Sequence, residues 1–162
     1  MSIIIGVDAS LTCTGVVVFD TETQEVLHSS THGAKPRQKG RDVGLAERCR
    51  QIRDSVMKAV RPWSGSVVRI EKCLSGAGPR TTAKTLMGLC SLNITLQVAF
   101  ADQGSEVQEI PVQTVRARLK RLQNVPGRVD KEQVPIILSN LVSLTPEFLA
   151  QPDLCDALAL CL

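Results

Sequence analysis

Short apolar runs and helical patterns alternate along the chain. Residues 3–8 and 15–20 are two apolar runs joined by the turn 9–14, and residues 25–31 form a third, weaker run. Their lengths and the turn between them predict three antiparallel strands in a meander. From Val43 to about Val60 apolar residues recur near helical spacing, which predicts a helix that Pro62 stops.

The second half of the chain continues the alternation. The expected elements are a buried strand over 67–70, a helix over 81–101, a strand over 107–110, a short basic helix over 112–121, a helix from Asp130 to about Leu144, and a last helix from Pro152. We therefore expect an α/β fold of the RNase-H-like type. It would have a five-stranded mixed sheet, three antiparallel strands followed by parallel additions, flanked by helices. No internal repeat or linker is visible, so residues 1–162 are expected to form a single domain.

Four carboxylates lie where predicted elements end or begin. Asp8 closes the first apolar run and Glu71 closes the fourth strand, while Asp153 and Asp156 open the last helix. The last two are three residues apart, so on a helix they share a face. If the two strands are neighbours and the helix packs on them, all four acids converge. Clustered carboxylates repel one another, and a divalent cation between them relieves that repulsion, so the pattern predicts a metal-dependent phosphoryl-transfer site.

Each acid also has an ordinary structural explanation. An aspartate after a strand, such as Asp8, often caps a turn, and Asp153 is favoured at a helix N-terminus whatever the chemistry. Glu71 is harder to explain in this way because Glu is not a turn former, and Asp156 is surrounded by apolar neighbours. Taken together, the four acids favour a metal site.

Positive charges are concentrated rather than numerous. The formal net charge is only +3, which argues nothing about nucleic acid. Residues 116–131 nevertheless contain a basic run: Arg116, Arg118, Lys120, Arg121, Arg128 and Lys131. That run is either a solvated face or a phosphate-contacting edge, and the same choice applies to Arg80 and Lys84. Only three Phe, one Trp and no Tyr are present, which disfavours recognition by base stacking.

Composition narrows the setting of the protein. The six cysteines form no C-x-x-C pair, which disfavours a zinc site. The first residues lack the pattern of a signal peptide, and no stretch approaches the roughly 18 apolar residues of a membrane span. We expect a reduced, cytoplasmic protein without a membrane partner. The predicted helix 81–101 is apolar around most of its circumference, and one face must pack on the sheet. The remaining apolar surface either forms a dimer contact or is buried within one subunit.

The motifs resemble those of RuvC-type Holliday junction resolvases. The segment 6–15 (GVDASLTCTG) resembles their first strand and turn, and the match continues at Ile70-Glu71, at 127–134 and at 153–159. The small size and substituted details are more similar to a phage-type member. Ala9-Ser10 replaces the commoner Pro-Gly, and Leu74 lies about where cellular members have a Phe that wedges into the junction.

The resemblance implies an RNase-H-like homodimer that introduces paired nicks into four-way junctions in the cytoplasm of a bacterium or phage-infected host. It implies two Mg²⁺ ions, with Mn²⁺ as an alternative, held by Asp8, Glu71, Asp153 and Asp156, with Lys131 as a catalytic lysine. The resemblance and the charge pattern together give five candidate DNA-binding residues: Arg116, Arg118, Arg128, Arg80 and Lys84. No junction helicase partner is identified.

Two rival functions stay open at this stage. One is a binding module that holds branched DNA without cutting it, against which the four acids argue. The other is a broader nuclease acting on flaps, forks or RNA. A sugar-kinase or actin-like ATPase is set aside, because 162 residues cannot supply its two domains.

Overall fold

The computed structural model describes residues 2–34, 44–73, 82–124 and 128–162. The strands are β1 (Ile3–Asp8), β2 (Thr14–Asp20), β3 (Glu25–His32), β4 (Val67–Glu71) and β5 (Val107–Ile110). The helices are α1 (Leu45–Val60), α2 (Ala83–Asp102), α3 (Val112–Gln123), α4 (Val134–Leu141), α5 (Pro146–Leu149) and α6 (Pro152–Cys161). Two short 3₁₀ turns, Arg61–Trp63 and Lys131–Gln133, precede β4 and α4.

The five strands form one mixed sheet in the order β3-β2-β1-β4-β5. Strands β1, β2 and β3 pair antiparallel, whereas β4 pairs parallel with β1 and β5 parallel with β4. The expected mixed sheet is confirmed. Because β1 and β4 are parallel neighbours with Val7 opposite Ile70, their last residues, Asp8 and Glu71, lie at the same end of the sheet.

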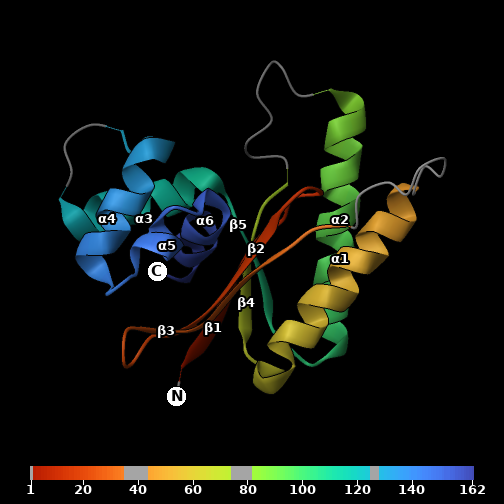
Figure 1. The fold of residues 1–162 in the computed structure, drawn as a ribbon, viewed down its shortest axis with the longest axis horizontal. Coiled ribbons are helices and arrows are strands. Elements are labelled where there is room, and N and C mark those ends of the chain that lie inside the picture. Colours follow the sequence, from red (N-terminus) through yellow and green to blue (C-terminus); the bar gives the residue numbers. More distant parts are fainter. Residues whose placement is uncertain (1, 35–43, 74–81, 125–127) are drawn as a thin grey trace.

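Helices cover both faces of the sheet, with α1 and α2 on one face and α3 to α6 on the other (Figure 1). Alternate residues of the central strands serve the two layers, as the period of a strand requires. Ile5 and Val7 pack with α1 and α2, and Ile4 packs with the layer that contains α6. Both faces of β1 are therefore buried, which explains why its sequence is continuously apolar.

Helix α6 lies directly on the backbone of β1 and β2. A Cβ on Gly6 would stand 1.9 Å from the carbonyl oxygen of Ala157, and a Cβ on Gly15 would stand 2.1 Å from that of Asp153. Real Cβ atoms do not approach other atoms so closely, so any side chain at either position would displace the helix. These two glycines set the distance between α6 and the sheet.

One predicted helix differs in detail. The expected helix from Asp130 to about Leu144 begins with the 3₁₀ turn, where Gln133 Oε1 accepts a hydrogen bond from the Asp130 backbone N–H at 2.9 Å. It ends at Leu141, because Val142 has an extended backbone. The short helix α5, whose N-cap is Thr145, follows and was not expected from the sequence.

Helix α2 meets a length and composition test for membrane spans that the count of unbroken apolar residues does not meet. It is 20 residues long with a window of mean hydropathy 1.2, so by length and composition it is able to cross a membrane. A helix in a protein core passes the same test. In this fold Leu92, Leu96 and Phe100 of α2 pack against the sheet and α1, while other apolar side chains of the helix are exposed.

Candidate active site

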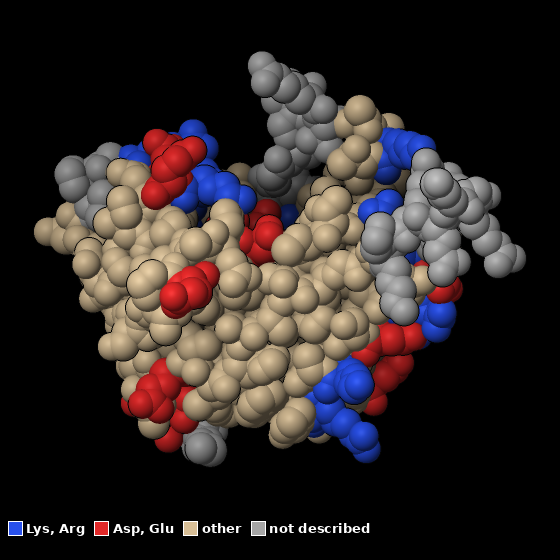
Figure 2. All heavy atoms as spheres, in the orientation of Figure 1, with Lys and Arg blue, Asp and Glu red and all other residues tan. Residues whose placement is uncertain are grey.

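The four predicted acids gather at the carboxyl ends of β1 and β4. Asp8 and Glu71 end these strands, and Asp153 and Asp156 lie in the first turns of α6. Gly15 pairs with Asp8 across the strands and also contacts the backbone of Asp153, so the two elements meet here. The space-filling view shows a hollow on this side of the molecule, with acidic side chains in it and Lys or Arg side chains beside it (Figure 2).

Electrostatics show that these acids share one environment. Burial, followed by the charges of Asp156, Glu71 and Asp153 in that order, raises the pKa of Asp8 to about 7. The pKa of Glu71 is also raised, first by burial and then by Asp156. Asp8 therefore lies within the electrostatic influence of the other three acids.

Lys131 supplies a positive charge to the cluster. Its Nζ lies 2.9 Å from Asp156 Oδ2, and this hydrogen bond is the largest cause of its raised pKa. The charges of Lys131 and Arg116 also act on Glu71, where they lower the pKa against the effect of burial. More than half of the Lys131 side chain is exposed, so its ammonium group is accessible from solvent.

The donor set fits a hard divalent cation. Carboxylate oxygens are the ligands that Mg²⁺ and Mn²⁺ prefer, and all four candidate ligands are carboxylates. Within the described residues no three His, Cys, Asp or Glu side chains already form a group able to hold one ion. Asp156 is paired with Lys131 instead.

A thiol that the sequence did not single out contacts this site. Cys13 hydrogen-bonds with Asp153 and Thr31, and its pKa is raised to about 11, chiefly by burial and then by the Asp153 contact. It lies in the turn after Asp8, which Thr14 stabilises by donating to the Ser10 carbonyl oxygen at 2.7 Å. About 140 residues separate Cys13 from Asp153, so no local sequence pattern indicates the pair.

The predicted DNA-binding residues have different environments. Arg128 and Lys84 are exposed, and Arg116 is half-buried beside Glu71. Arg118 does not present its whole guanidinium to solvent: its Nη1 is buried without a hydrogen-bond partner, and its charge, after burial, lowers the pKa of Arg69. Arg80 and Leu74 lie outside the described residues.

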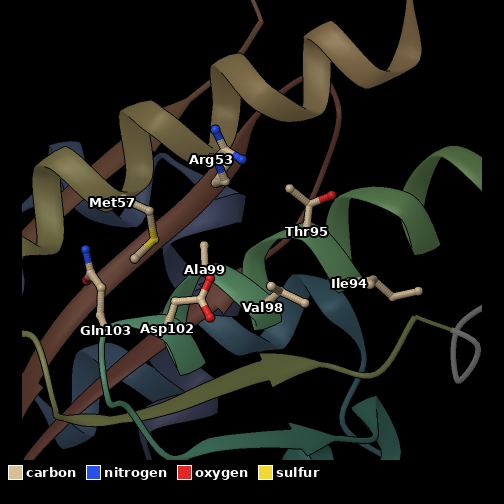
Figure 3. A pocket seen from close by; sticks show the side chains of 8 residues that line it. All are labelled: Arg53, Met57, Ile94, Thr95, Val98, Ala99, Asp102 and Gln103. Atoms are coloured by element: carbon tan, nitrogen blue, oxygen red, sulfur yellow. The ribbon is translucent and has the colours of Figure 1, made fainter.

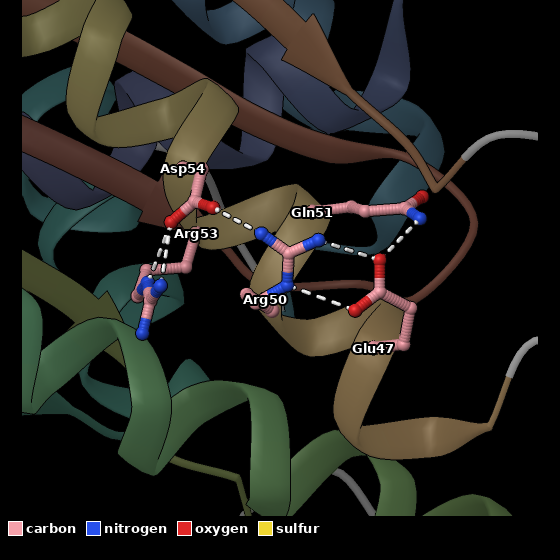
Figure 4. A network of polar contacts seen from close by, with 5 residues as sticks. All are labelled: Glu47, Arg50, Gln51, Arg53 and Asp54. Carbon is pink, nitrogen blue, oxygen red and sulfur yellow. Dashed lines mark hydrogen bonds and ion pairs between the residues drawn. The ribbon is translucent and has the colours of Figure 1, made fainter.

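A second group of charged side chains lies on α1 (Figure 4). Arg50 bridges Glu47 and Asp54 with distances of 2.7 and 3.2 Å, and Arg53 lies 2.6 Å from Asp54. The acids and bases of this group neutralise one another, and all four side chains are substantially exposed. Exposed ion pairs of this kind contribute little to stability, and the group has no feature of a reaction site.

The mixed sheet, its two helical layers and the acids at the carboxyl ends of β1 and β4 define an RNase-H-like fold with a nuclease-type site. The structure is similar to that of T. thermophilus RuvC in complex with Holliday junction substrate, with a TM-score of 0.75 and 17% identity over 99% of this chain and 90% of that one. It is also similar to a second Thermus thermophilus RuvC structure, with a TM-score of 0.69 and 19% identity over 98% of this chain and 90% of that one.

Sequence comparison then gives the family. The family model described as crossover junction endodeoxyribonuclease RuvC matches residues 4–162. The crossover junction endodeoxyribonuclease RuvC of Bordetella avium (strain 197N) is 31% identical over 166 residues, covering 96% of this chain and 79% of that protein. The chain belongs to the RuvC family, which confirms the resemblance seen in its motifs.

Proposed function

We propose that this protein is a metal-dependent endonuclease that resolves four-way (Holliday) DNA junctions by paired nicks. Membership of the RuvC family supports the reaction. The observation that carries the proposal is the shared environment of Asp8, Glu71, Asp153 and Asp156 with Lys131 beside them. A module that only binds DNA has no need to keep four repelling acids together.

We propose two Mg²⁺ ions as the cofactor, with Mn²⁺ as an alternative. Asp8, Glu71, Asp153 and Asp156 would hold the ions. When bound, such ions activate a water molecule and neutralise charge on the phosphodiester. The raised pKa of Asp8 has a direct consequence: near pH 7 a proton competes with the cation for this carboxylate.

The basic residues complete the mechanism. Lys131 has an exposed ammonium group at the edge of the acids, where it would stabilise negative charge on the scissile phosphate. Arg116 is near enough to Glu71 to lower its pKa and would contact an adjacent phosphate. Arg128 and Lys84 are exposed and available for backbone phosphates, which dominate affinity for DNA. The position of Arg118 does not support the DNA contact expected for it.

We propose that two copies of the chain associate through α2. Met87, Ile94 and Val98 are 67%, 61% and 54% exposed, and their spacing of seven and four residues places them on one face of the helix. A groove of about 510 Å³ lies beside them, to which α1 contributes Arg53 and Met57 (Figure 3). A symmetric dimer would cover this apolar face and place two sites against opposed strands of one junction.

The dimer proposal makes a testable prediction. Ile94→Glu introduces a charge into the proposed interface and is expected to weaken dimerisation by at least about 100-fold. Sedimentation velocity over a concentration series measures this change. Paired nicking should become uncoordinated single nicking on a supercoiled cruciform plasmid.

Ile136→Glu is the matched control for this experiment. Ile136 is 64% exposed and lies on α4, in the opposite helical layer. This variant should keep the wild-type dimer. Equal dissociation of both variants, or a stable dimer with Ile94→Glu, would contradict the proposed interface.

We also propose that residues 1–162 act as a single nuclease domain, because both helical layers pack on one sheet. The setting that suits junction resolution is the cytoplasm of a bacterium or a phage-infected host.

Cleavage of a synthetic immobile four-way junction tests the function. Paired nicks with Mg²⁺ or Mn²⁺, lost in EDTA, are the expected result. Linear duplex, a three-way fork, a flap and an RNA–DNA hybrid serve as competing substrates. Equal cutting of forks, flaps or hybrids would replace the proposal with a broader nuclease, and tight junction binding without cutting in either metal would favour the binding module.

A further inference from the structure

Asn93 is a buried polar residue on an apolar part of α2. It is only 3% exposed, and its helical neighbours Leu92 and Leu96 are fully buried core residues. A buried side-chain amide is stable in such surroundings only when its polar atoms are bonded. The partners of Asn93 therefore indicate what the residue is for.

One partner is the backbone of a candidate metal ligand. Asn93 Nδ2 donates to the carbonyl oxygen of Glu71 with a distance of 2.8 Å. The pairing of β4 with β1 ends at Ile70, and its pairing with β5 ends at Glu71. Beyond Glu71 the backbone keeps a bond to β5, from the Lys72 N–H to the Ile110 carbonyl oxygen at 3.0 Å, and Asn93 attaches the Glu71 carbonyl group to α2.

Asn93 is itself held in place by a second amide. Its Oδ1 accepts from Gln97 Nε2, which also donates to Glu109 Oε1 on β5 at 2.9 Å. Gln97 is one turn further along α2, so the two amides form a short chain from β5 to the end of β4. The orientation of the Asn93 amide is fixed by this chain, since only Nδ2 can donate to the Glu71 carbonyl oxygen.

We infer that Asn93 is a positioning residue for Glu71: it fixes the end of β4 so that the Glu71 carboxylate faces Asp8 and Asp156. The inference rests on the proposed function, in which Glu71 binds metal. Partners that orient a metal ligand typically change metal affinity by about 10- to 100-fold when they are removed. We expect loss of the Asn93 donor to weaken metal binding by at least about tenfold.

Two variants test the hydrogen bond that Asn93 donates to Glu71 and separate its loss from the effect of an added charge. Asn93→Asp keeps the size of the side chain and an acceptor for Gln97 but removes the donor to Glu71. Asn93→Leu removes both interactions and adds no charge. Thr95→Val is the control, because the Thr95 hydroxyl donates to the Ser91 carbonyl oxygen within the same helix, at 2.7 Å.

The primary measurement is Mn²⁺ binding, followed by electron paramagnetic resonance of the free ion, with thermal melting recorded alongside. Weaker binding in both Asn93 variants with an unchanged control supports the inference. Binding within twofold of wild type in both folded variants overturns it. Weakening in Asn93→Asp alone also overturns it, because added charge would then be the cause.

Gln97→Leu keeps the inference testable if neither Asn93 variant folds. It leaves the bond from Asn93 to Glu71 but removes the amide that orients Asn93, so a several-fold weakening of Mn²⁺ binding is expected. Wild-type binding in folded Gln97→Leu would leave Asn93 with a structural role only and overturn the inference.

Junction cleavage by the wild type separates this inference from the proposed function. A wild type that binds Mn²⁺ but cuts no junction would refute the function and leave the role of Asn93 standing. A wild type that binds no Mn²⁺ at millimolar concentration would refute both.

Discussion

Asp8→Asn is expected to abolish junction cleavage, by about 10³-fold or more, while stabilising the metal-free protein. Cleavage falls because the central carboxylate of the site is lost. Stability rises because Asp8 is buried beside three other acids, and Asn removes its charge without changing its size. Thermal melting in EDTA at pH 8 should show an increase of roughly 5 to 10 °C.

The sign of this stability change depends on pH. The folded-state pKa of Asp8, about 7, lies above its ordinary value of 3.8. Well below pH 3.8 the carboxyl is protonated in both the folded and the unfolded protein, so it contributes no difference. As pH rises from 4 to 7 the unfolded protein loses this proton first, and the wild type loses about 1.4 kcal/mol of stability for each unit of pKa shift.

The melting difference between Asp8→Asn and the wild type should therefore be largest at pH 8 and small at pH 4. Saturating Mg²⁺ should reverse the order at pH 8, because it stabilises the wild type more than the variant. Glu25→Gln is the control, since it removes one acid at the opposite end of the sheet, where Glu25 pairs with Asp20. A pH-independent difference would contradict the clustered acids.

Gly6→Ala is the second change with a large expected effect. The added Cβ would meet the Ala157 carbonyl oxygen at 1.9 Å, and neither backbone is able to rotate away. Helix α6 must shift outward, and with it Asp153 and Asp156. We expect destabilisation of about 1–3 kcal/mol or more, and a loss of cleavage of about 100-fold from a displacement on the order of 1 Å.

Gly44→Ala is the matched control for Gly6→Ala. Gly44 caps α1 with a φ of −57°, and nothing lies within 4 Å of a Cβ built there. Circular dichroism and melting show whether each variant folds. Gly15→Ala, whose Cβ would meet the Asp153 carbonyl oxygen at 2.1 Å, should repeat the loss of activity. Wild-type cleavage by both active-site variants would contradict the control of α6 by these glycines.

Most of the fold could be predicted from the pattern of apolar residues. The five strands and the helices α1, α2, α3 and α6 agree with the predicted ranges within about two residues, because each has a strong period and a clear stop signal such as Pro62 or Pro111. Helix α5 has only four residues, too few for any period to be visible. Counting unbroken apolar residues did not single out α2, because polar residues interrupt its apolar ones, although the helix passes a test of length and mean hydropathy.

The acids of the site were predictable because each ends or begins an element, and parallel strands bring their carboxyl ends together. Their neighbours were not. Cys13 meets Asp153, and Asn93 meets Glu71, only through contacts between elements distant in sequence. The burial of Arg118 Nη1 and the effect of the Arg118 charge on Arg69 likewise depend on the fold, and the basic run does not reveal them. Assignment to a phage-type member stays a prediction.

The packing of α6 on β1 and β2 also has a consequence for synthesis of the protein. Gly6 in β1 and Gly15 in β2 are covered by α6, which is synthesised about 140 residues later. Their backbones therefore stay uncovered until that helix is made. Contacts of such long range form late in folding. Two of the four acids, Asp153 and Asp156, reach the sheet with that same helix. We therefore expect a nascent chain to lack two of the four proposed metal ligands, and hence cleavage activity, until α6 has left the ribosome and packed on the sheet.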